Sequence, residues 1–575
     1  MASSSRLTLA ALALAVLLLP AAPARAEQTP EMSASLSGNY LAGRYAGAQR
    51  DNRTAAGFYA RALDDDPDNA MILDRAFMLE VSAGNIERAV ALAGRVLERD
   101  KRHRVARLVL GLKAFRAGRY KTARSHFKAA SQGPIGELTS AILTAWSFQA
   151  ERKTKEAVAA LDDLQKTEAF AVFRAYNGAL IHDLAGNRTK AEPLYRTAYE
   201  RASGSFRIVQ SFGSFLERAG RFEEAAKLYA DMLDGAPDRP MIDDALARNK
   251  AGTASQRPVQ TAVAGAAEGL FSIASALTDE SSIDGALMYV QVALYMDPDL
   301  TIAQTLLGNI YKDTDRRVEA IEAYEKVPAN SPLRPNADLQ IAINLEKLDR
   351  VDEAKDRLAG IIARYPDDRR PVIAMADLLR IRKDYAGAIG FYDKAVDLGG
   401  DAMQRDWTLY YYRGICHERT RQWPSAEADF KKALELNPDQ PLVLNYLGYS
   451  WVEQNMNLAE AMDMIRKAVE LRANDGYIVD SLGWAHFKLR EYAEAVKILE
   501  RAVELRPDDP VINDHLGDAY WRVGRTLEAR FQWSHAKDLK PEPEDLEEIE
   551  RKLEQGLPPE EAGKATSQTG TPGKS

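Results

Sequence analysis

The stretch that decides the fold is Val511 to Pro541, VINDHLGDAYWRVGRTLEARFQWSHAKDLKP. Its small and apolar residues recur at spacings of three and four, as from Ala529 to Trp533, and such spacings place side chains on one face of an α-helix. Gly517 has no side chain, so a second helix can approach it closely. Val523-Gly524-Arg525 has the composition of a turn. The stretch therefore predicts two antiparallel helices joined by a turn and ended by a proline.

The same pattern recurs along most of the chain. The alanine of the second helix returns in phased runs, mostly at steps of 34 residues: Ala55, Ala89, Ala123, Ala157, Ala191, Ala225, then Ala286, Ala320, Ala354, Ala388, then Ala426, Ala461, Ala495 and Ala529. Many of these alanines have a proline twelve residues later, as Pro507, and a glycine twelve residues earlier, as Gly483. A fixed period of this length is the signature of a helical-repeat protein.

Many units carry all or part of the motif Leu-Gly-x-x-Tyr on their first helix. An alanine, a phenylalanine or tyrosine, a second alanine and a proline follow at fixed distances. In this pattern the chain resembles the tetratricopeptide repeat over roughly residues 36–542. The resemblance implies an all-α fold: a right-handed superhelical solenoid of antiparallel helix pairs, about 14 in number, in one array or two. Neighbouring pairs in a solenoid bury each other's apolar faces, and the terminal units need polar caps.

The phase of the repeat also predicts the domain organisation. We expect an N-terminal array of about six units over 36–239 and a C-terminal array of about eight units over 267–542. Between them, residues 240–266 are out of phase, and they are interpreted either as a hinge between two grooves or as a degenerate repeat in one continuous solenoid. Residues 543–557 are expected to form a capping helix, and 558–575 a disordered tail.

The first 26 residues have the features of an export signal. Arg6 precedes an apolar run from Leu7 to Leu19, and Ala24-Arg25-Ala26 matches a signal-peptidase site, so cleavage is expected between Ala26 and Glu27. A lipoprotein signal needs a cysteine at the cleavage point, and Cys416 is the only cysteine of the chain. We therefore predict an exported, soluble protein without a lipid anchor, in the periplasm of a Gram-negative bacterium.

Composition and motifs argue against several classes of function. The formal net charge is −8, with no basic run, which disfavours nucleic acid as a partner. A single cysteine allows no intramolecular disulfide and no Cys-x-x-Cys pair. Motifs for zinc, for phosphate and for a nucleophilic serine are missing from the sequence. The prediction is a protein that is not an enzyme and that carries no metal or cofactor.

The candidate binding residues lie on the first helices of the units. In the family, certain positions of the first helix line the concave groove. In this chain those positions are occupied by Asn445, Tyr449, Tyr477, Asp480, Trp484, Asp514, Asp518 and Trp521 in the C-terminal array, and by Trp146 in the N-terminal array. Exposed tryptophan and tyrosine are typical binding anchors. The alternative is that these residues contact the neighbouring unit. Asp480 and Asp514 would repel a carboxylate, so a clamp for an acidic C-terminus is not expected.

The function that follows is a periplasmic scaffold or adaptor that binds proteins or peptides in its grooves. The run Asn445 to Trp451, repeated in part by Asp480 to Trp484, resembles large envelope tetratricopeptide proteins. That resemblance implies an adaptor for an envelope protease and its cell-wall hydrolase substrates. The alternatives are an assembly factor for polysaccharide export or outer-membrane biogenesis and, from another class, a small-ligand carrier or an atypical enzyme.

Overall fold

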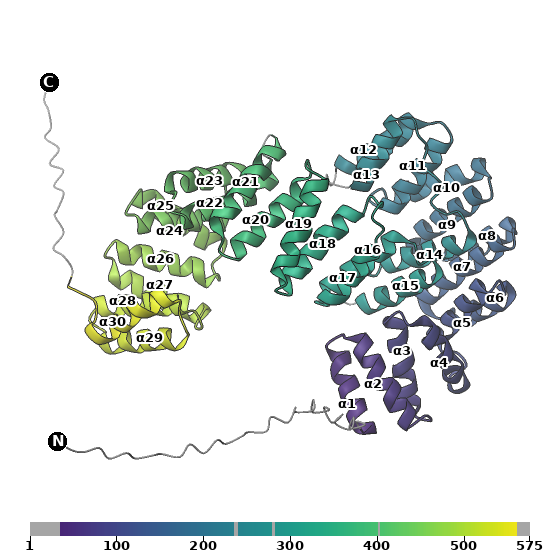
Figure 1. Ribbon diagram of the computed structural model, residues 1–575, viewed down its shortest axis with the longest axis horizontal. Helices are drawn as coiled ribbons and strands as arrows, with labels where there is room; N and C mark the ends of the chain where they lie inside the picture. The colour runs from purple at the N-terminus through teal and green to yellow at the C-terminus, as the bar shows by residue number, and fades with distance from the viewer. Residues whose placement is uncertain (1–34, 235–239, 279–281, 401–402, 560–575) are drawn as a thin grey trace, which may run out of the picture. The chain divides into compact units, whose positions relative to one another are not determined.

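A computed structural model describes residues 35–559, except 235–239, 279–281 and 401–402 (Figure 1). Across those residues the chain forms thirty α-helices and three short 3-10 helices, with no β-strand. None of the described helices is long and apolar enough to cross a membrane. The expected signal sequence, its cleavage site at Ala26 and Glu27, and residues 560–575 of the expected tail lie outside the described residues.

The chain divides into two compact units, residues 1–333 and 334–575. The helices of unit 1 are α1 Leu36–Ala48, α2 Asn52–Asp65, α3 Ala70–Ser82, α4 Ile86–Arg99, α5 Arg104–Arg116, α6 Tyr120–Ala130, α7 Gly133–Ala150, α8 Thr154–Ala159, η1 Asp162–Lys166, η2 Glu168–Phe170, α9 Ala171–Leu184, α10 Arg188–Arg201, α11 Phe206–Arg218, α12 Phe222–Asp234, α13 Pro240–Lys250, α14 Ala262–Ser275, α15 Ile283–Met296, α16 Thr301–Asp313 and α17 Arg317–Glu325.

The helices of unit 2 are α18 Arg334–Lys347, α19 Val351–Arg364, α20 Arg369–Ile381, α21 Tyr385–Gly399, η3 Gln404–Asp406, α22 Trp407–Arg419, α23 Trp423–Leu436, α24 Pro441–Glu453, α25 Leu458–Leu471, α26 Gly476–Lys488, α27 Tyr492–Leu505, α28 Pro510–Arg522, α29 Thr526–Asp538 and α30 Pro543–Gln555. In both units consecutive helices pack as pairs, such as α5 with α6 and α26 with α27. The predicted all-α solenoid of helix pairs is confirmed.

The phased alanines form the core of each pair. All fourteen, from Ala55 to Ala529, have no solvent-exposed surface. The aromatic residue four positions later is also buried, as Phe127 and Tyr324 show. Small and large side chains on one face of the second helix therefore interlock with the first helix, and dense interlocking of this kind is typical of protein interiors.

Glycine on the first helix sets how closely the two helices of a pair approach. A Cβ added to Gly111 would lie 2.5 Å from Cε1 of Phe127. A Cβ at Gly308 would lie at the same distance from Tyr324, and one at Gly517 at the same distance from Trp533. In each case the glycine stands sixteen residues before the large side chain. The ring fills the space that a side chain on the first helix would otherwise take.

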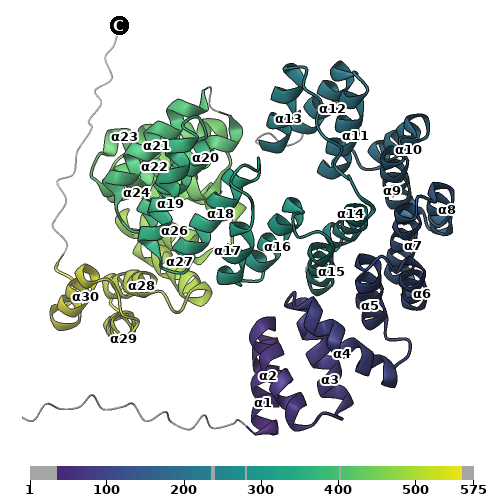
Figure 2. The ribbon, with the colours of Figure 1, turned by 45° about the vertical axis from the view of Figure 1, so that its right-hand side comes forward.

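Helices α14 and α15 lie on the inner side of the curve formed by α3 to α11 (Figures 1 and 2). Helix α14 packs on α7 and α9, and α15 packs on α3 and α5. The division between the compact units falls after Leu333 and not within 240–266, and those residues include helix α13 and the first turn of α14. Unit 1 thus continues past the irregular segment and folds back on itself.

Replacing Gly111 by alanine tests the close contact within a pair. We expect Gly111→Ala to destabilise unit 1 by about 1–3 kcal/mol, because the new Cβ overlaps the ring of Phe127. Gly94 is the matched control, since it lies inside α4 with no atom within 4 Å of an added Cβ. Gly94→Ala should stabilise the helix by about 0.5–1 kcal/mol. Thermal melting by circular dichroism measures both. Equal effects from the two substitutions would contradict the packing described.

Candidate functional site

The predicted residues of unit 2 do come from the first helices of three successive pairs. Asn445 and Tyr449 lie on α24, Tyr477, Asp480 and Trp484 on α26, and Asp514, Asp518 and Trp521 on α28. Tyr477 alone among the predicted residues is exposed, and Asp480 and Asp518 are buried. The others are half-buried. The repeat phase therefore predicted the correct helices, but most of these side chains contact other residues of the protein and are not exposed.

Asp480 is held by the neighbouring pair. Nδ1 of His515 lies 3.0 Å from each carboxylate oxygen of Asp480. The ring of Trp484 stacks on the imidazole with centroids 3.9 Å apart and on Phe487 with centroids 4.7 Å apart. Burial alone would lower the pKa of His515, but the charge and hydrogen bond of Asp480 raise it above its usual range. Asp480 and Trp484 thus join α26 to α28.

Asp514 and Asp518 are ion-paired with the last helix. Nζ of Lys552, on α30, lies 2.7 Å from Asp514 and 2.9 Å from Asp518. Nε1 of Trp533 donates a further hydrogen bond to Asp518 over 2.9 Å. Burial and the nearby carboxylate of Asp514 raise the pKa of Asp518 to about 6. In this structure both aspartates attach α30 and are covered by it.

The two tryptophans also make contacts inside unit 2. The indole nitrogen of Trp484 donates a hydrogen bond to Glu453. The ring of Trp521 packs against Trp533 with centroids 5.4 Å apart, and it lies 2.0 Å from the position of an added Cβ at Gly556. These contacts agree with the alternative that the tryptophans serve packing between neighbouring elements. Substituting either one would be expected to disturb the fold as well as any groove.

Trp146 is not open to a partner, contrary to the prediction. It is fully buried because α14 covers it: a Cβ at Gly265 would lie 2.3 Å from the indole ring. Its Nε1 donates a hydrogen bond to Asn177 over 2.9 Å. Gly269, one turn further along α14, lies against Ile142 in the same way. Glycine and alanine along α14 thus allow this helix to lie directly on the inner face of α7.

The segment before α14 also occupies the inner face of unit 1. Ser214 of α11 donates a hydrogen bond to the carbonyl of Gln256 over 3.0 Å, and the backbone N–H of Ser255 donates one to Glu217 over 2.8 Å. Nε of Arg257 lies 3.3 Å from Asp183 on α9. These contacts resemble those that a bound peptide would make, but the chain itself supplies the peptide.

A buried ion pair fixes the first turns of α14 against α11. Nε of Arg207 donates a hydrogen bond to Glu268 over 2.9 Å, and the hydroxyl of Tyr176 donates one to the same carboxylate over 3.0 Å. Both Arg207 and Tyr176 have raised pKa values: burial and the carboxylate raise that of Tyr176, and the carboxylate outweighs burial for Arg207. Across α7 to α11 the chain therefore covers much of the inner face of unit 1, and a smaller cavity of about 360 Å³ remains beside Tyr176 and Arg207.

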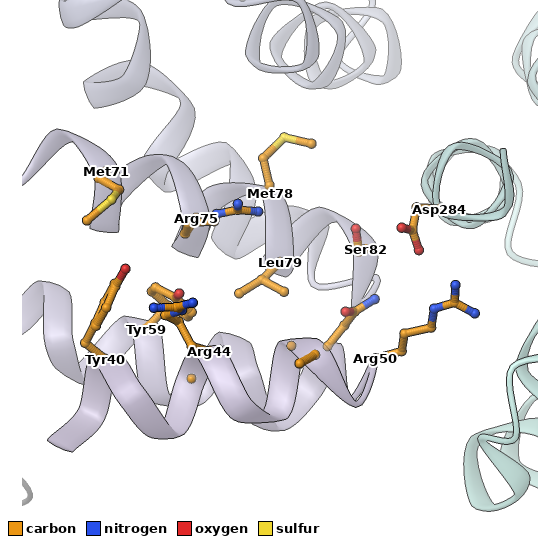
Figure 3. Close-up of a pocket in the computed structure, with 14 residues that line it drawn as sticks. Tyr40, Arg44, Arg50, Tyr59, Met71, Arg75, Met78, Leu79, Ser82 and Asp284 are labelled. Carbon is orange, nitrogen blue, oxygen red and sulfur yellow. The ribbon is translucent and has the colours of Figure 1, made fainter. Parts of the chain in front are cut away.

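The inner face stays open over α1 and α3. A cavity of about 720 Å³ lies there, lined among others by Tyr40, Arg44, Arg75 and Met78 (Figure 3). None of these four residues is among the binding residues predicted from the sequence, which were chosen largely by their tryptophans and tyrosines. A signal was present, because Met71 and Arg75 fall on the first helix of a unit, six and two residues respectively before the packing position of Phe77.

The described residues contain no group of three histidine, cysteine, aspartate or glutamate side chains placed to hold a metal ion. Burial raises the pKa of Cys416 to about 11, which leaves its thiol protonated and weakly nucleophilic. The inner faces carry charged, hydrogen-bonding and apolar side chains that can take part in recognition.

The cluster around Lys552 predicts a pH dependence. The folded-state pKa of Asp518 is raised, so this group contributes stability at low pH that is lost as the pH rises through about 6. Asp518→Asn removes the titration. Between about pH 4 and pH 7 the natural protein should lose about 1–3 kcal/mol of unfolding free energy that the variant does not lose. The melting temperature of the variant should therefore rise relative to that of the natural protein over this pH range. Glu470→Gln, on the exposed surface of α25, is the control. A constant offset for Asp518→Asn at all pH values would contradict the prediction.

Comparisons with known proteins place the repeat in a family. Models of the tetratricopeptide repeat match residues 75–134, 176–240, 339–402, 407–440 and 479–509. TPR repeat-containing protein PA4667 of Pseudomonas aeruginosa is 27% identical over 183 residues, which are 32% of this chain and 30% of that protein. Protein O-mannosyl-transferase TMTC3 of Homo sapiens is 30% identical over 190 residues, 30% of this chain and 20% of that protein.

The chain therefore spans less than a third of the length of either relative. Among solved structures, the APC/C hetero-tetramer Cut9-Hcn1 shows 14% identity and a TM-score of 0.38, covering 92% of this chain and 97% of that chain. The matched segments contain eight of the fourteen phased alanines and the contact of Gly111 with Phe127. On the phase of its sequence, its stacked helix pairs and these family matches, the chain belongs to the tetratricopeptide-repeat family.

Proposed function

We propose that this protein is an exported, non-catalytic scaffold that binds other proteins or peptides on the inner faces of its helix pairs. Proteins of the tetratricopeptide-repeat fold present extended concave surfaces, and stacked repeats supply many contacts at once. Fold alone does not assign function, so the proposal depends on which side chains the inner faces leave free.

The observation that carries the proposal is an exposed apolar residue at the same position of several first helices. Met71, Tyr477 and Val511 each stand six residues before the packing position of their unit, which is Phe77, Gly483 or Gly517. Their side chains are 56%, 50% and 41% exposed. A large apolar side chain costs free energy in water, and one that recurs in register on the concave side is typical of a contact surface for a partner.

The finer assignment is to the bacterial envelope. Residues 1–26 support export, because their charge, apolar run and small residues match a signal sequence. The sequence resemblance to large envelope tetratricopeptide proteins supports an adaptor that brings an envelope protease to cell-wall hydrolases. Within this proposal the predicted groove residue Tyr477 is an anchor, and Trp484 and Trp521 hold the surface in place behind it.

Affinity capture with the mature protein, Glu27 to Ser575, tests the proposal. The double variant Tyr477→Ser/Val511→Ser removes two exposed apolar contacts of unit 2. We expect it to weaken partner binding by about tenfold, since interface anchors contribute about 1–2 kcal/mol each. Both side chains are largely outside the core, so circular dichroism and the melting temperature should change little. Capture from an envelope fraction, followed by quantitative mass spectrometry, measures the effect.

Leu471→Ser is the control for this experiment. Leu471 is 46% exposed at the end of α25, a second helix, so it matches the variants in exposure but not in position. The control should capture partners as the natural protein does. If the control and the double variant lose partners equally, the inner-face position has no special role. If the natural protein captures no specific partner, the scaffold proposal fails.

A further inference from the structure

The cavity over α1 and α3 lies on a part of the unit 1 inner face that α14 does not cover. It has a volume of about 720 Å³, and its wall includes Asp284 at the start of α15. A second cavity of about 600 Å³ continues from it toward α5 and shares Met71, Arg75 and Met78 with the first. Together these cavities form a continuous recess along the first helices of three units.

The filled and open parts of the inner face meet at the end of α3. The side chain of Gln291, on α15, lies against Gly84 and donates a hydrogen bond to the carbonyl of Ser82 over 3.4 Å. Tyr295, one turn later, donates a hydrogen bond to Glu87 over 3.2 Å. Helix α15 therefore forms the wall at one end of the recess and does not cover it.

The recess is lined by arginines from separate segments. Arg44 lies on α1, Arg50 follows that helix, and Arg75 lies on the facing helix α3 (Figure 3). All three are exposed, and none makes an ion pair or side-chain hydrogen bond with the described part of the chain. Arg104, at the edge of the second cavity, is likewise exposed without such a partner among the described residues.

The carboxylates near the recess do not neutralise these arginines. Asp74 is paired with His103, whose Nε2 lies 3.0 Å away, and the hydrogen bond from His103 lowers the pKa of Asp74. Asp284 lines the cavity, but it forms no ion pair with the arginines among the described residues. Elsewhere in unit 1 inner-face arginines are paired, as Arg218 is with Asp183 over 2.6 Å. In a chain of net charge −8, this recess is a local positive surface.

Apolar side chains lie between the arginines. Met71 is exposed, and Met78 and Tyr40 line the same cavity (Figure 3). Methionine is flexible and polarisable, so it adapts to apolar side chains of different shapes. Arginine binds carboxylates in a bidentate geometry. Because the arginines come from three segments, they match several charges spaced along an extended chain better than one compact anion.

We propose that this recess binds an acidic peptide segment with interspersed apolar side chains, contributed by a partner protein. The proposal rests on the scaffold function proposed above and assigns it a second surface, in unit 1, with its own ligand chemistry. Carboxylates of the segment pair with Arg44 and Arg75, and its apolar side chains contact Met71 and Met78. Salt weakens the binding, since the ion pairs form near solvent.

Fluorescence anisotropy with three labelled synthetic peptides tests the proposal on the mature protein. The peptides share the same leucine and methionine residues and differ only in having glutamate, glutamine or lysine between them. We expect the glutamate peptide to bind at least about tenfold more tightly than the glutamine peptide, and the lysine peptide to show no binding. Arg44→Glu/Arg75→Glu should reduce binding of the glutamate peptide by at least about tenfold without changing the melting temperature.

Lys121→Glu/Lys128→Glu is the matched control, because it makes the same change of net charge on α6 and both lysines are exposed. This control should bind the glutamate peptide as the natural protein does. Equal loss in both double variants, or no binding of the glutamate peptide to the natural protein, would overturn the proposal. Tighter binding of a labelled oligothymidylate at the same arginines would also overturn it, because the ligand would then be a nucleic acid.

The experiment separates this proposal from the scaffold function. If the glutamate peptide does not bind while Tyr477→Ser/Val511→Ser still lowers partner capture, the acidic-peptide site fails and the scaffold function stands. If the mature protein captures no partner and binds no peptide, both fail.

Discussion

The close contact between a glycine on the first helix and a large side chain on the second is the constraint on which the rest of the structure depends. Gly111 against Phe127, Gly213 against Tyr229 and Gly517 against Trp533 leave no room for a Cβ. The buried alanines pack beside these contacts. The two helices of such a pair lie close together, and stacked helix pairs present their first helices on one concave side.

A concave side is a binding surface only where nothing else fills it. In unit 1, α14 covers α7 and α9, and the segment before it contacts α9 and α11. In unit 2, α30 brings Lys552 onto Asp514 and Asp518. The protein thus uses parts of its own inner faces for stability. The open parts include the recess over α1 and α3 and exposed apolar residues such as Tyr477.

The sequence predicted the pairs well because the 34-residue phase assigns each residue to one face of one helix. That is sufficient for the buried alanines and for the glycine positions, which depend only on contacts inside a pair. It is insufficient for Trp146, whose phase is correct but which α14 covers from far along the chain. Asp518 is a similar case, since its partner Lys552 lies beyond the last repeat. Phase gives the direction of a side chain, and long-range packing decides whether that side chain meets solvent.

The most direct measurement compares thiol labelling at two inner-face positions of unit 1. Cys416 is buried with a raised pKa, so it gives a low background. Cysteine introduced as Met71→Cys lies on the open part, and Ile142→Cys lies beneath α14, against Gly269. The account predicts fast maleimide labelling at position 71 and strong protection at position 142 in the folded mature protein. Equal labelling rates at the two positions would contradict it, because the inner face would then not be divided into a filled and an open part.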